Sequence, residues 1–577
     1  MPKYRDVGLV LLAALIGVLA GVVVFAMSWI AYRLNVLLFL LPDGIRISAQ
    51  ASLAHPMLAL VPAAGGALMG ASIWLARRSA ARRPIDPIEA NALYGGRMSL
   101  NESIRVAAQT IISNGFGASV GLEAGYTQMG AGIASRIARA LKLRRADVRM
   151  LVGCGAAGAI SAAFAAPITG AFYAFELIIG VYSVALVAPV MAAALAASVT
   201  ASLLGAVQTP VDIGIVPALR PQDLVPFLVL GVIGGLVSVA IMRLVALVEQ
   251  GFSLVRLPAP IRPVLGGALV GMLGLMAPQV LSSGHGVLHV ELGIEQGILA
   301  LAALFVLKIL ASAISLGSGF RGGLFFASLV LGALLGKLFE AGVVAAGVGL
   351  SPEPVMAAVV GMACLAVGIV GGPMTMTFLV LETTNDIAIS GAVLAASIMS
   401  SVVVRETFGY SFSTWRLHLR GETIRSAQDI GWIRNLTVGS MMRSDVKTVP
   451  LSATLGQFRA AIPLGSTQRV IALDEDGRYA GIVLVADAYL EDSESSGSAA
   501  DRPSTIAGLL RCTDCTLVPS MDAKEAAMLF EQSNTEELAV VDDPESRWLV
   551  GLLTEGHLLR RYAEEVDRAR RDLAGEG

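Results

Sequence analysis

Long apolar runs separated by short polar stretches occupy roughly the first 400 residues of the chain. They lie at about residues 7–40, 57–76, 104–120, 148–180, 184–206, 223–248, 262–280, 294–316, 322–346, 353–370, 373–381 and 388–404. A helix needs about 20 apolar residues to span a bilayer, a length that some of these runs reach while others are short or broken by Gly or Pro. We therefore predict an all-α polytopic membrane unit over residues 1–420 that contains broken helices. The run at 7–40 is too long for a signal-peptide core, so we expect it to be retained.

The composition of the chain and its pattern of apolar residues change near residue 420. The first 420 residues carry 26 Lys+Arg and 18 Asp+Glu, whereas the last 157 carry 16 and 26, a net charge of −10. In this tail, strand-like segments at 470–473 and 479–485 flank one acidic turn, and segments at 538–541 and 548–553 flank a second. A Glu/Ser/Gly-rich stretch at 491–504 has the composition of a linker. The tail is thus predicted to be two copies of an α/β unit, at 433–492 and 504–570.

An internal repeat divides the membrane unit into halves of about 1–210 and 211–420. The segment Pro167–Glu176 (PITGAFYAFE) matches Pro373–Glu382 (PMTMTFLVLE) in its Pro, Thr, Phe and Glu positions. A glycine-rich loop that opens an apolar helix precedes each segment, at 121–125 and at 319–323. Duplicated membrane halves with interrupted helices are typical of transporters whose site lies where the halves meet.

Glu123 is the first candidate functional residue, because it lies between glycines in the loop Gly121-Leu-Glu-Ala-Gly125. An ionisable group at membrane depth is costly and is a functional hypothesis by default. A carboxylate there can occupy an anion site and leave it when it is protonated or displaced. The alternative is a loop-end glutamate at the water interface.

The second glycine loop carries no carboxylate at the equivalent place. Its sequence Gly322-Gly-Leu-Phe325 opens a helix, which leaves the backbone N–H groups of Leu324 and Phe325 available to an anion.

Taken together, these motifs resemble those of the CLC chloride channels and chloride/proton antiporters. The residues 121–128 (GLEAGYTQ) are similar to the family's GREGPxxQ, and 319–327 (GFRGGLFFA) to GxxGGxFxP. The segments Phe164–Glu176 and Gly371–Glu382 are similar to FxAPxxGxxFxxE and its second-half partner. The tail resembles the paired CBS domains of many members. The resemblance implies two inverted-repeat halves in the membrane, a cytosolic CBS pair and a homodimer with one pore per subunit.

The resemblance also implies roles for single residues. Glu123 would be the external gating glutamate, Leu324 and Phe325 would present backbone amides to the central anion, and Tyr410 would present its hydroxyl. Pro84 falls where the family has a pore serine, and proline at this place is found in nitrate-preferring relatives. The neighbouring arginines are equally explained as a cytosolic loop.

Two departures from the family pattern bear on mechanism. Antiporters usually have a Glu-Glu pair where this chain has Glu176-Leu177, and leucine cannot carry a proton. This favours passive conduction, with Glu176 left as the candidate for a proton path in an antiporter. Leu122 replaces the arginine beside the gating glutamate, which is expected to weaken the positive field there.

The preferred interpretation is a passive channel for chloride, or another small inorganic anion, in a prokaryotic inner membrane, gated by Glu123. The alternative is a proton-coupled chloride or nitrate antiporter. An enzyme is not expected, because the apolar runs hold no nucleophile–base constellation, and the expected partners are membrane lipid, a second copy of the chain and small anions rather than nucleic acid.

The tail raises one further question of ligands. Thr554 stands at the hydroxyl position of a CBS nucleotide site, while His557 replaces the ribose-binding Asp, so an adenosine-nucleotide sensor and a purely structural tail remain equal alternatives. No cofactor or metal is expected, since the pair Cys512/Cys515 lacks a second ligand pair and His285 and His289 lack a third ligand.

Overall fold

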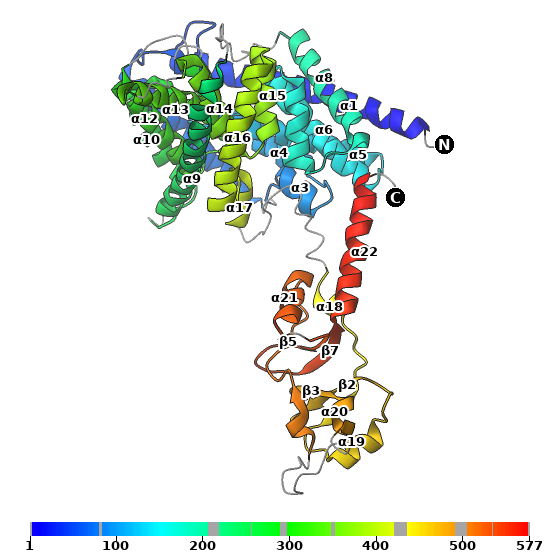
Figure 1. The fold of residues 1–577 in the computed structure, drawn as a ribbon. Helices are drawn as coiled ribbons and strands as arrows, with labels where there is room; N and C mark the ends of the chain where they lie inside the picture. Colours follow the sequence, from blue (N-terminus) through cyan, green and yellow to red (C-terminus); the bar gives the residue numbers. More distant parts are fainter. Residues whose placement is uncertain are drawn as a thin grey trace. The chain divides into compact units, whose positions relative to one another are not determined.

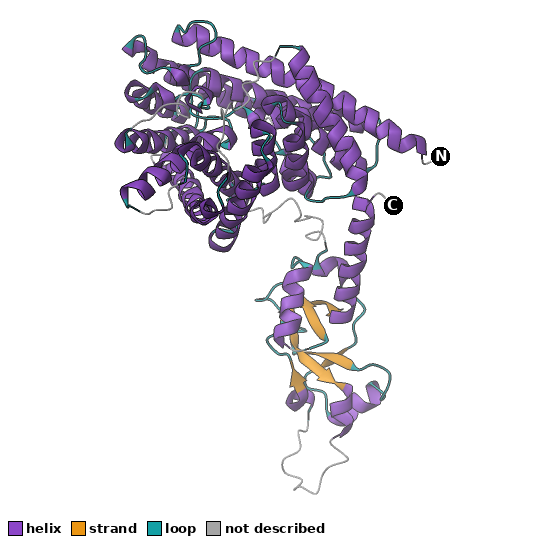
Figure 2. Cartoon of the chain, turned by 45° about the horizontal axis from the view of Figure 1, so that its top comes forward, coloured by secondary structure: helices purple, strands orange, loops and turns teal. Residues whose placement is uncertain are grey.

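The computed structural model describes residues 3–79, 83–205, 219–254, 257–288, 297–347, 352–419, 436–490, 505–533 and 535–574. Contacts divide the chain into two units, Met1–Asp429 and Ile430–Gly577. The first unit is helical and the second holds the strands (Figure 2). Among the described residues, eight helices are long and apolar enough to cross a membrane.

Eight α-helices lie in the described residues of the first half of the membrane unit. They are α1 (Lys3–Phe39), α2 (Val61–Arg78), α3 (Pro87–Leu93), α4 (Leu100–Gly115), α5 (Glu123–Ala140), α6 (Arg145–Phe164), α7 (Pro167–Tyr173) and α8 (Val184–Leu203). A π-helical segment, Ala174–Ile179, continues α7 and carries Glu176. The loop between α1 and α2 holds two short 3₁₀ helices, η1 (Ile47–Ala49) and η2 (Pro56–Leu60).

The second half repeats this arrangement with helices of similar type. They are α9 (Leu224–Leu254), α10 (Arg262–Met276), α12 (Ile298–Ser318), α13 (Phe325–Ala345), α14 (Pro354–Val370), α15 (Pro373–Thr384), α16 (Ile387–Thr407) and α17 (Phe412–His418), with 3₁₀ helices η4 (Pro221–Asp223) and η5 (Pro278–Val280). Helices far apart in sequence pack together, as α9 and α16 do in Figure 1.

Each half contains a pair of helices that approach closely at glycines. A Cβ built on Gly130 of α5 would lie 2.2 Å from the carbonyl oxygen of Gly155 in α6. In the second half, a Cβ on Gly332 of α13 would lie 2.4 Å from the carbonyl oxygen of Gly361 in α14. Because helices gain little from the hydrophobic effect inside a membrane, small residues that allow close backbone approach hold such pairs together.

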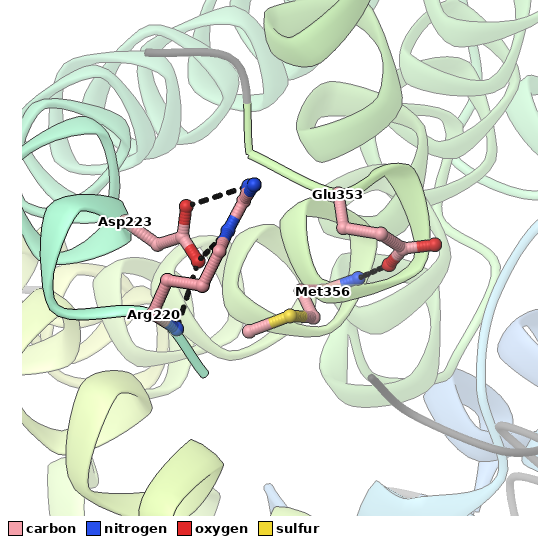
Figure 3. A network of polar contacts seen from close by, with 4 residues as sticks. All are labelled: Arg220, Asp223, Glu353 and Met356. Carbon is pink, nitrogen blue, oxygen red and sulfur yellow. Dashed lines mark hydrogen bonds and ion pairs between the residues drawn. The ribbon is translucent and has the colours of Figure 1, made fainter. Parts of the chain in front are cut away.

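Carboxylates cap the starts of α9 and α14, two helices that pack against each other (Figure 3). Before α9, Asp223 accepts a hydrogen bond from the backbone N–H of Arg220 at 3.1 Å and pairs with its guanidinium at 3.1 Å. Before α14, Glu353 accepts from the backbone N–H of Met356 at 3.1 Å. Each negative charge therefore satisfies N–H groups or favours the dipole of a helix start.

The second unit contains two small sheets of the same design. The first has the order β1–β2–β3–β4, from Thr448–Pro450, Arg469–Leu473, Tyr479–Leu484 and Leu510–Arg511. The second has the order β5–β6–β7, from Thr516–Leu517, Glu537–Val541 and Leu549–Thr554. In both, the first strand runs parallel to the second, which pairs antiparallel with the third. The helices around them are α18 (Val438–Met441), α19 (Leu455–Ala461), α20 (Val485–Leu490), α21 (Ala523–Ser533) and α22 (Glu555–Ala574), with 3₁₀ helix η7 (Ile506–Leu509).

The two copies exchange their first segments. The backbone N–H of Val438 donates to Met521 at 2.9 Å, so α18 belongs to the second sheet. Conversely, the backbone N–H of Ile506 donates to Ala453 at 3.1 Å, and β4 completes the first sheet. The expected strands are confirmed, but the sequence-order division at 433–492 and 504–570 differs from the packing units, because each opening segment buries its apolar residues against the other copy.

Candidate functional site

The two glycine loops of the membrane unit meet each other directly. The backbone N–H of Gly121 donates to the carbonyl oxygen of Gly323 at 2.9 Å, and that of Gly323 donates back to Gly121 at 3.2 Å. The starts of α5 and α13, which follow these loops, are therefore held side by side. Their unsatisfied N–H groups and their positive dipole ends gather in one region, which suits an anion.

Side chains at the end of α4 fix the shape of this junction. The amide of Asn114 donates to the carbonyl oxygen of Val120 at 2.9 Å and closes the first loop. The hydroxyl of Ser113 accepts from the backbone N–H of Arg321 at 3.0 Å and ties the second loop to the same helix end. The junction is thus built from polar groups that lie about 200 residues apart in sequence.

Glu123 begins α5 and places its carboxylate in this junction. The residue is 5% exposed, and its carboxylate interacts with the backbone N–H groups of Glu123 itself and of Phe326 in α13. A Cβ built on Gly121 would lie 1.9 Å from Oε2, so only glycine leaves room for the carboxylate there. Oε2 is buried without a hydrogen-bond partner, which is a costly condition for a carboxylate oxygen.

Glu123 lines two cavities of the membrane unit. The first, called here the Arg321 cavity, has a volume of about 160 Å³. It is lined by Pro84, Asp86, Pro87, Ile88, Val106, Thr110, Glu123, Ala124, Thr127, Gln128, Tyr173, Ile178, Arg321, Gly322, Gly323, Leu324, Phe325, Ile369, Val370, Phe412, Ser413, Arg416 and Leu417. Both cavities are large enough for an anion and more than one water molecule.

The second, called here the Arg46 cavity, has a volume of about 120 Å³. It is lined by Val24, Phe25, Ser28, Trp29, Ala31, Tyr32, Asn35, Arg46, Ile47, Ser48, Asn114, Leu122, Glu123, Tyr126, Ala162, Ala163, Phe164, Gly205, Ser282, Ser283 and His285. Glu123 is the one residue common to both linings. A carboxylate between two cavities is in the position that a gate requires.

Three other predicted residues lie in the Arg321 cavity. Leu324 is the N-cap of α13 and Phe325 its first residue, so the free N–H groups of the helix start belong to this wall. Pro84 lines the same cavity from the segment before α3. Asp86 shapes that segment by accepting from the backbone N–H of Ile88 at 2.8 Å.

Tyr410, in contrast, lines a different cavity, together with Glu176 and Leu177. Its hydroxyl lies 3.2 Å from Nδ1 of His418, and the two rings stack at 4.6 Å. The α17 hydroxyl that lines the Arg321 cavity is that of Ser413. Tyr410 precedes the helix, which starts after the capping residue Ser411, and its ring packs against the rings of Trp415 and His418 of α17.

Glu176 takes part in a reciprocal pair of helix caps. Its carboxylate accepts from the backbone N–H groups of Met374 and Thr375, at 2.9 and 2.8 Å, and from the Thr375 hydroxyl at 2.6 Å. In the same way, Glu382 accepts from the backbone N–H groups of Ile168 and Thr169, both at 2.8 Å, and from the Thr169 hydroxyl at 2.6 Å. The two repeated Pro…Glu segments thus cap each other, which explains why both retain Thr and Glu.

The cavities also contain functional candidates that the motifs did not reveal. Arg321 and Arg416 bring two guanidinium groups to the Arg321 cavity, and Arg46 and His285 line the other. Arg321 was visible inside the second glycine loop, but Arg46 and Arg416 have no motif around them. His289, considered with His285 as a ligand pair, lies outside the described residues.

In the tail, Thr554 ends β7 and His557 lies in the first turn of α22. The Thr554 hydroxyl accepts from the backbone N–H of His557 at 3.2 Å, so it acts as a helix cap. Cys512 and Cys515 lie between β4 and β5, and burial raises the pKa of the Cys512 thiol. This geometry accounts for Thr554 by local structure.

Comparisons with known proteins agree with this fold. Residues 65–405 match the family model described as voltage gated chloride channel, and residues 512–564 match the CBS domain model. A relative from Ralstonia nicotianae, named as ClcB-like, is 30% identical over 357 residues, which cover 60% of this chain and 82% of the relative. The voltage-gated ClC-type chloride channel ClcB of Citrobacter koseri is 26% identical over 398 residues, covering 68% and 95%.

Solved structures show the same fold at low sequence identity. A slow cyanobacterial Cl⁻/H⁺ antiporter superposes with a TM-score of 0.62 at 20% identity, covering 71% of this chain and 97% of that one. A eukaryotic CLC transporter superposes with a TM-score of 0.59 at 16% identity, covering 95% and 97%. The second likeness extends over both the membrane unit and the tail.

Proposed function

The chain belongs to the voltage gated chloride channel family, and we propose that it is a passive chloride channel of the cell membrane, gated by Glu123. The observation that carries the proposal is that Glu123 lines both the Arg321 cavity and the Arg46 cavity. Its carboxylate occupies the junction where the starts of α5 and α13 meet, which is where helix N-termini attract an anion. An anion passes when the carboxylate leaves.

The permeating anion loses part of its water at this junction, and the protein must replace that water. The N–H groups at the start of α13, next to Leu324 and Phe325, are donors that do this without side-chain reorganisation. The guanidinium groups of Arg321 and Arg416 add positive charge to the same cavity. Pro84 contributes no backbone N–H or hydroxyl to the wall, so selectivity rests on the helix starts and the arginines.

The hydrogen bonds that the Glu176 carboxylate accepts favour passive conduction over proton coupling. Its carboxylate accepts three hydrogen bonds that hold the start of α15, so moving a proton onto it would disturb that cap. Leu177, beside it, is 8% exposed and apolar. A relay through this region would need a group other than these two.

A proton-coupled antiporter for chloride or nitrate is the second candidate. One observation favours it, namely that Oε2 of Glu123 is buried without a hydrogen-bond partner and can accept a proton. Glu123 would then carry protons as well as gate anions.

The orientation of the proposed channel follows from charge. Arg77, Arg78, Arg83 and Arg97 cluster around the α2–α4 connections, and a bias of arginine toward short loops is typical of the cytosolic side. The Arg321 cavity, lined by Pro84 and Asp86 of these connections, then faces the cytosol, and the Arg46 cavity faces outward. The tail follows α17, so we assign the CBS pair to the cytosol, where a regulatory role suits it. By family likeness, the channel acts as a homodimer.

A liposome experiment tests the proposal. Full-length protein is reconstituted with a chloride gradient, and chloride and proton movements are recorded together with an anion electrode and a pH electrode. We expect chloride to flow down its gradient without coupled proton movement. Protons driven uphill by the chloride gradient would replace the channel with the antiporter, and liposomes that pass no chloride at all would exclude both.

A further inference from the structure

The Arg46 cavity has an unusual charge content for a hollow among membrane helices. Of the residues that line it, Arg46 is the only permanent cation and Glu123 the only carboxylate. Polar groups of Tyr126, Ser283 and His285 complete the wall. Among the described residues, the cavity therefore combines one fixed positive charge and the Glu123 carboxylate with neutral polar groups.

Arg46 has no ion-pair partner among the residues that the structure describes. Its side chain is only partly exposed, yet its neighbourhood offers the hydroxyls of Tyr126 and Tyr32 and no carboxylate bonded to it. In the same region, Arg33 pairs with Asp43 at 3.1 Å, so the nearby acidic side chain is already engaged. A partly buried cation that no carboxylate contacts directly is destabilising, and it is rarely kept without a use.

The fold itself does not explain the Arg46 side chain. Only its backbone contributes to local structure, because its carbonyl oxygen accepts from the N–H of Ala49 at 3.0 Å at the start of η1. Any residue could supply that bond. Arg46 instead lines the cavity, where a guanidinium can offer up to five N–H donors in a planar fork.

Lys308 of α12 lies behind the same wall, as an amine buried among carbonyl oxygens. It is 1% exposed, and its side-chain nitrogen donates to the carbonyl oxygens of Val280 at 3.0 Å and Ser282 at 2.9 Å. Ser282 lines the Arg46 cavity, so these bonds fix part of its wall. The charge that attracts an anion into the cavity is therefore that of Arg46.

We propose that the Arg46 cavity is an anion-binding site in its own right, separate from the junction that the Glu123 carboxylate occupies. Its ligand is a small monovalent inorganic anion such as chloride, held by the Arg46 guanidinium. The proposal rests on the channel function and adds the place where the anion waits before Glu123 moves. Arg46 thereby supplies, from a loop about 75 residues earlier in the chain, the positive charge that is absent at Leu122.

This site corrects an expectation drawn from the sequence. The replacement of arginine by Leu122 predicted a weaker positive field at the entrance. Leu122 and Arg46 line the same cavity, so a cation is present there despite the change in the motif.

The test measures how chloride flux saturates. Full-length protein is reconstituted in liposomes, and chloride uptake is followed as the chloride concentration rises, with gluconate keeping ionic strength constant. The variants are Arg46→Gln, Arg46→Lys and, as a matched control, Arg33→Gln, which removes the same charge from an exposed ion pair outside the cavity.

We expect Arg46→Gln to raise the half-saturating chloride concentration roughly tenfold, because one charge-assisted contact to the anion is lost. The maximal rate should stay the same. Arg46→Lys should shift it less, and Arg33→Gln should match the parent protein. Adding Leu122→Arg to Arg46→Gln should restore the parent value, because the charge returns to the same cavity. A purely structural role for Arg46 predicts no such rescue.

The outcomes separate this inference from the channel function. If the parent protein conducts no anion, the proposed function fails. If it conducts, and Arg46→Gln saturates like Arg33→Gln, the function stands and the Arg46 site is wrong. If Arg46→Gln does not fold, two other measurements decide. The site is supported if Arg46→Lys shifts the half-saturating chloride concentration by less than twofold and if Leu122→Arg rescues an Arg46→Ala protein. The site is overturned if neither result is found.

Discussion

Gly121 and Gly323 exchange two backbone hydrogen bonds, of 2.9 and 3.2 Å, and so join the two halves of the membrane unit at the point where Glu123 lies. The two glycines occupy equivalent positions in the two repeated halves, but the groups around them differ. The first loop carries a carboxylate and the second carries bare N–H groups, and the carboxylate of the first reaches Phe326 of the second half. In the proposed channel, one half thus provides the blocking carboxylate and the other half the N–H groups that bind the anion.

The two glycines are predicted to differ in their tolerance of a methyl group. A Cβ on Gly121 would meet the Glu123 carboxylate at 1.9 Å, whereas the nearest atom to a Cβ on Gly323 is 3.5 Å away. Gly121→Ala should therefore displace the carboxylate and raise resting chloride flux several-fold, and Gly323→Ala should leave flux near the parent value. Liposome chloride efflux measures both. Equal behaviour of the two variants would argue against the carboxylate as the blocking group.

Glu123→Gln is predicted to leave the path open. The neutral amide imitates a protonated carboxyl group, so chloride flux should rise and lose its dependence on pH. Efflux rates across a pH series provide the measurement, with Glu406→Gln as a control on an exposed carboxylate that pairs with Arg405. Retention of the parent pH profile in the Glu123 variant would remove it from the gate.

The reciprocal caps predict equal losses of stability from Glu176→Gln and Glu382→Gln. Each change removes one oxygen of a carboxylate that accepts three hydrogen bonds, which should cost about 2 kcal/mol in each case. Thermal unfolding of the detergent-purified protein measures this cost, and flux in liposomes should remain passive in both. A selective effect of the Glu176 change on proton movement would favour the antiporter instead.

Ser413, rather than the motif residue Tyr410, is predicted to contribute to chloride binding. Tyr410→Phe removes a hydroxyl that contacts His418, from a residue that lines the cavity shared with Glu176 and Leu177. The half-saturating chloride concentration should therefore not change. Ser413→Ala removes a hydroxyl from the Arg321 cavity and should weaken chloride binding about two- to fivefold, the value of one neutral hydrogen bond. Saturation curves for the two variants compare them directly, and the opposite ranking would return Tyr410 to the anion path.

The second hairpin of the tail is predicted to weaken in acid. The Ser546 hydroxyl donates to Asp542 at 2.7 Å, and this bond, together with backbone N–H groups, lowers the pKa of Asp542 below its ordinary value of 3.8. A depressed carboxyl pKa stabilises the fold above that ordinary value, and the contribution disappears as pH falls through the lowered one. The protection factors in hydrogen exchange at residues 537–554 of the full chain, which correct for the intrinsic slowing of amide exchange in acid, should therefore fall at low pH. In Asp542→Asn the protection factors should already be lower at neutral pH and should change less with acid.

Much of this protein could be predicted from its sequence because the relevant physics is local. The lengths of the apolar runs follow from the thickness of the membrane, and the alternation after residue 436 follows from half-buried strands. Glu123 was identifiable because a carboxylate between glycines in an apolar region needs a reason to be there. Leu324 and Phe325 were located through a motif that keeps its spacing, and Pro84 through its distance from Pro87 in a motif that is poorly kept. All three line the Arg321 cavity.

Other features depend on which segments meet, and sequence spacing does not contain that information. Ser413 of α17 lines the Arg321 cavity, whereas Tyr410, which precedes that helix, lines the cavity beside Glu176. Glu176 proved to be a cap for α15, a role set by Met374 and Thr375 of the other half. Arg46, from the loop after α1, and Leu122, directly before α5, line one cavity although they are far apart in sequence.

The sequence by itself therefore determined the environment of each segment, the duplication and the position of the gate. The tertiary structure decided which polar groups share a cavity and which are consumed by capping helices. The physical reason is that burial in a membrane imposes its pattern residue by residue along the chain, whereas an anion site needs donors and charges to converge from segments that are distant in sequence.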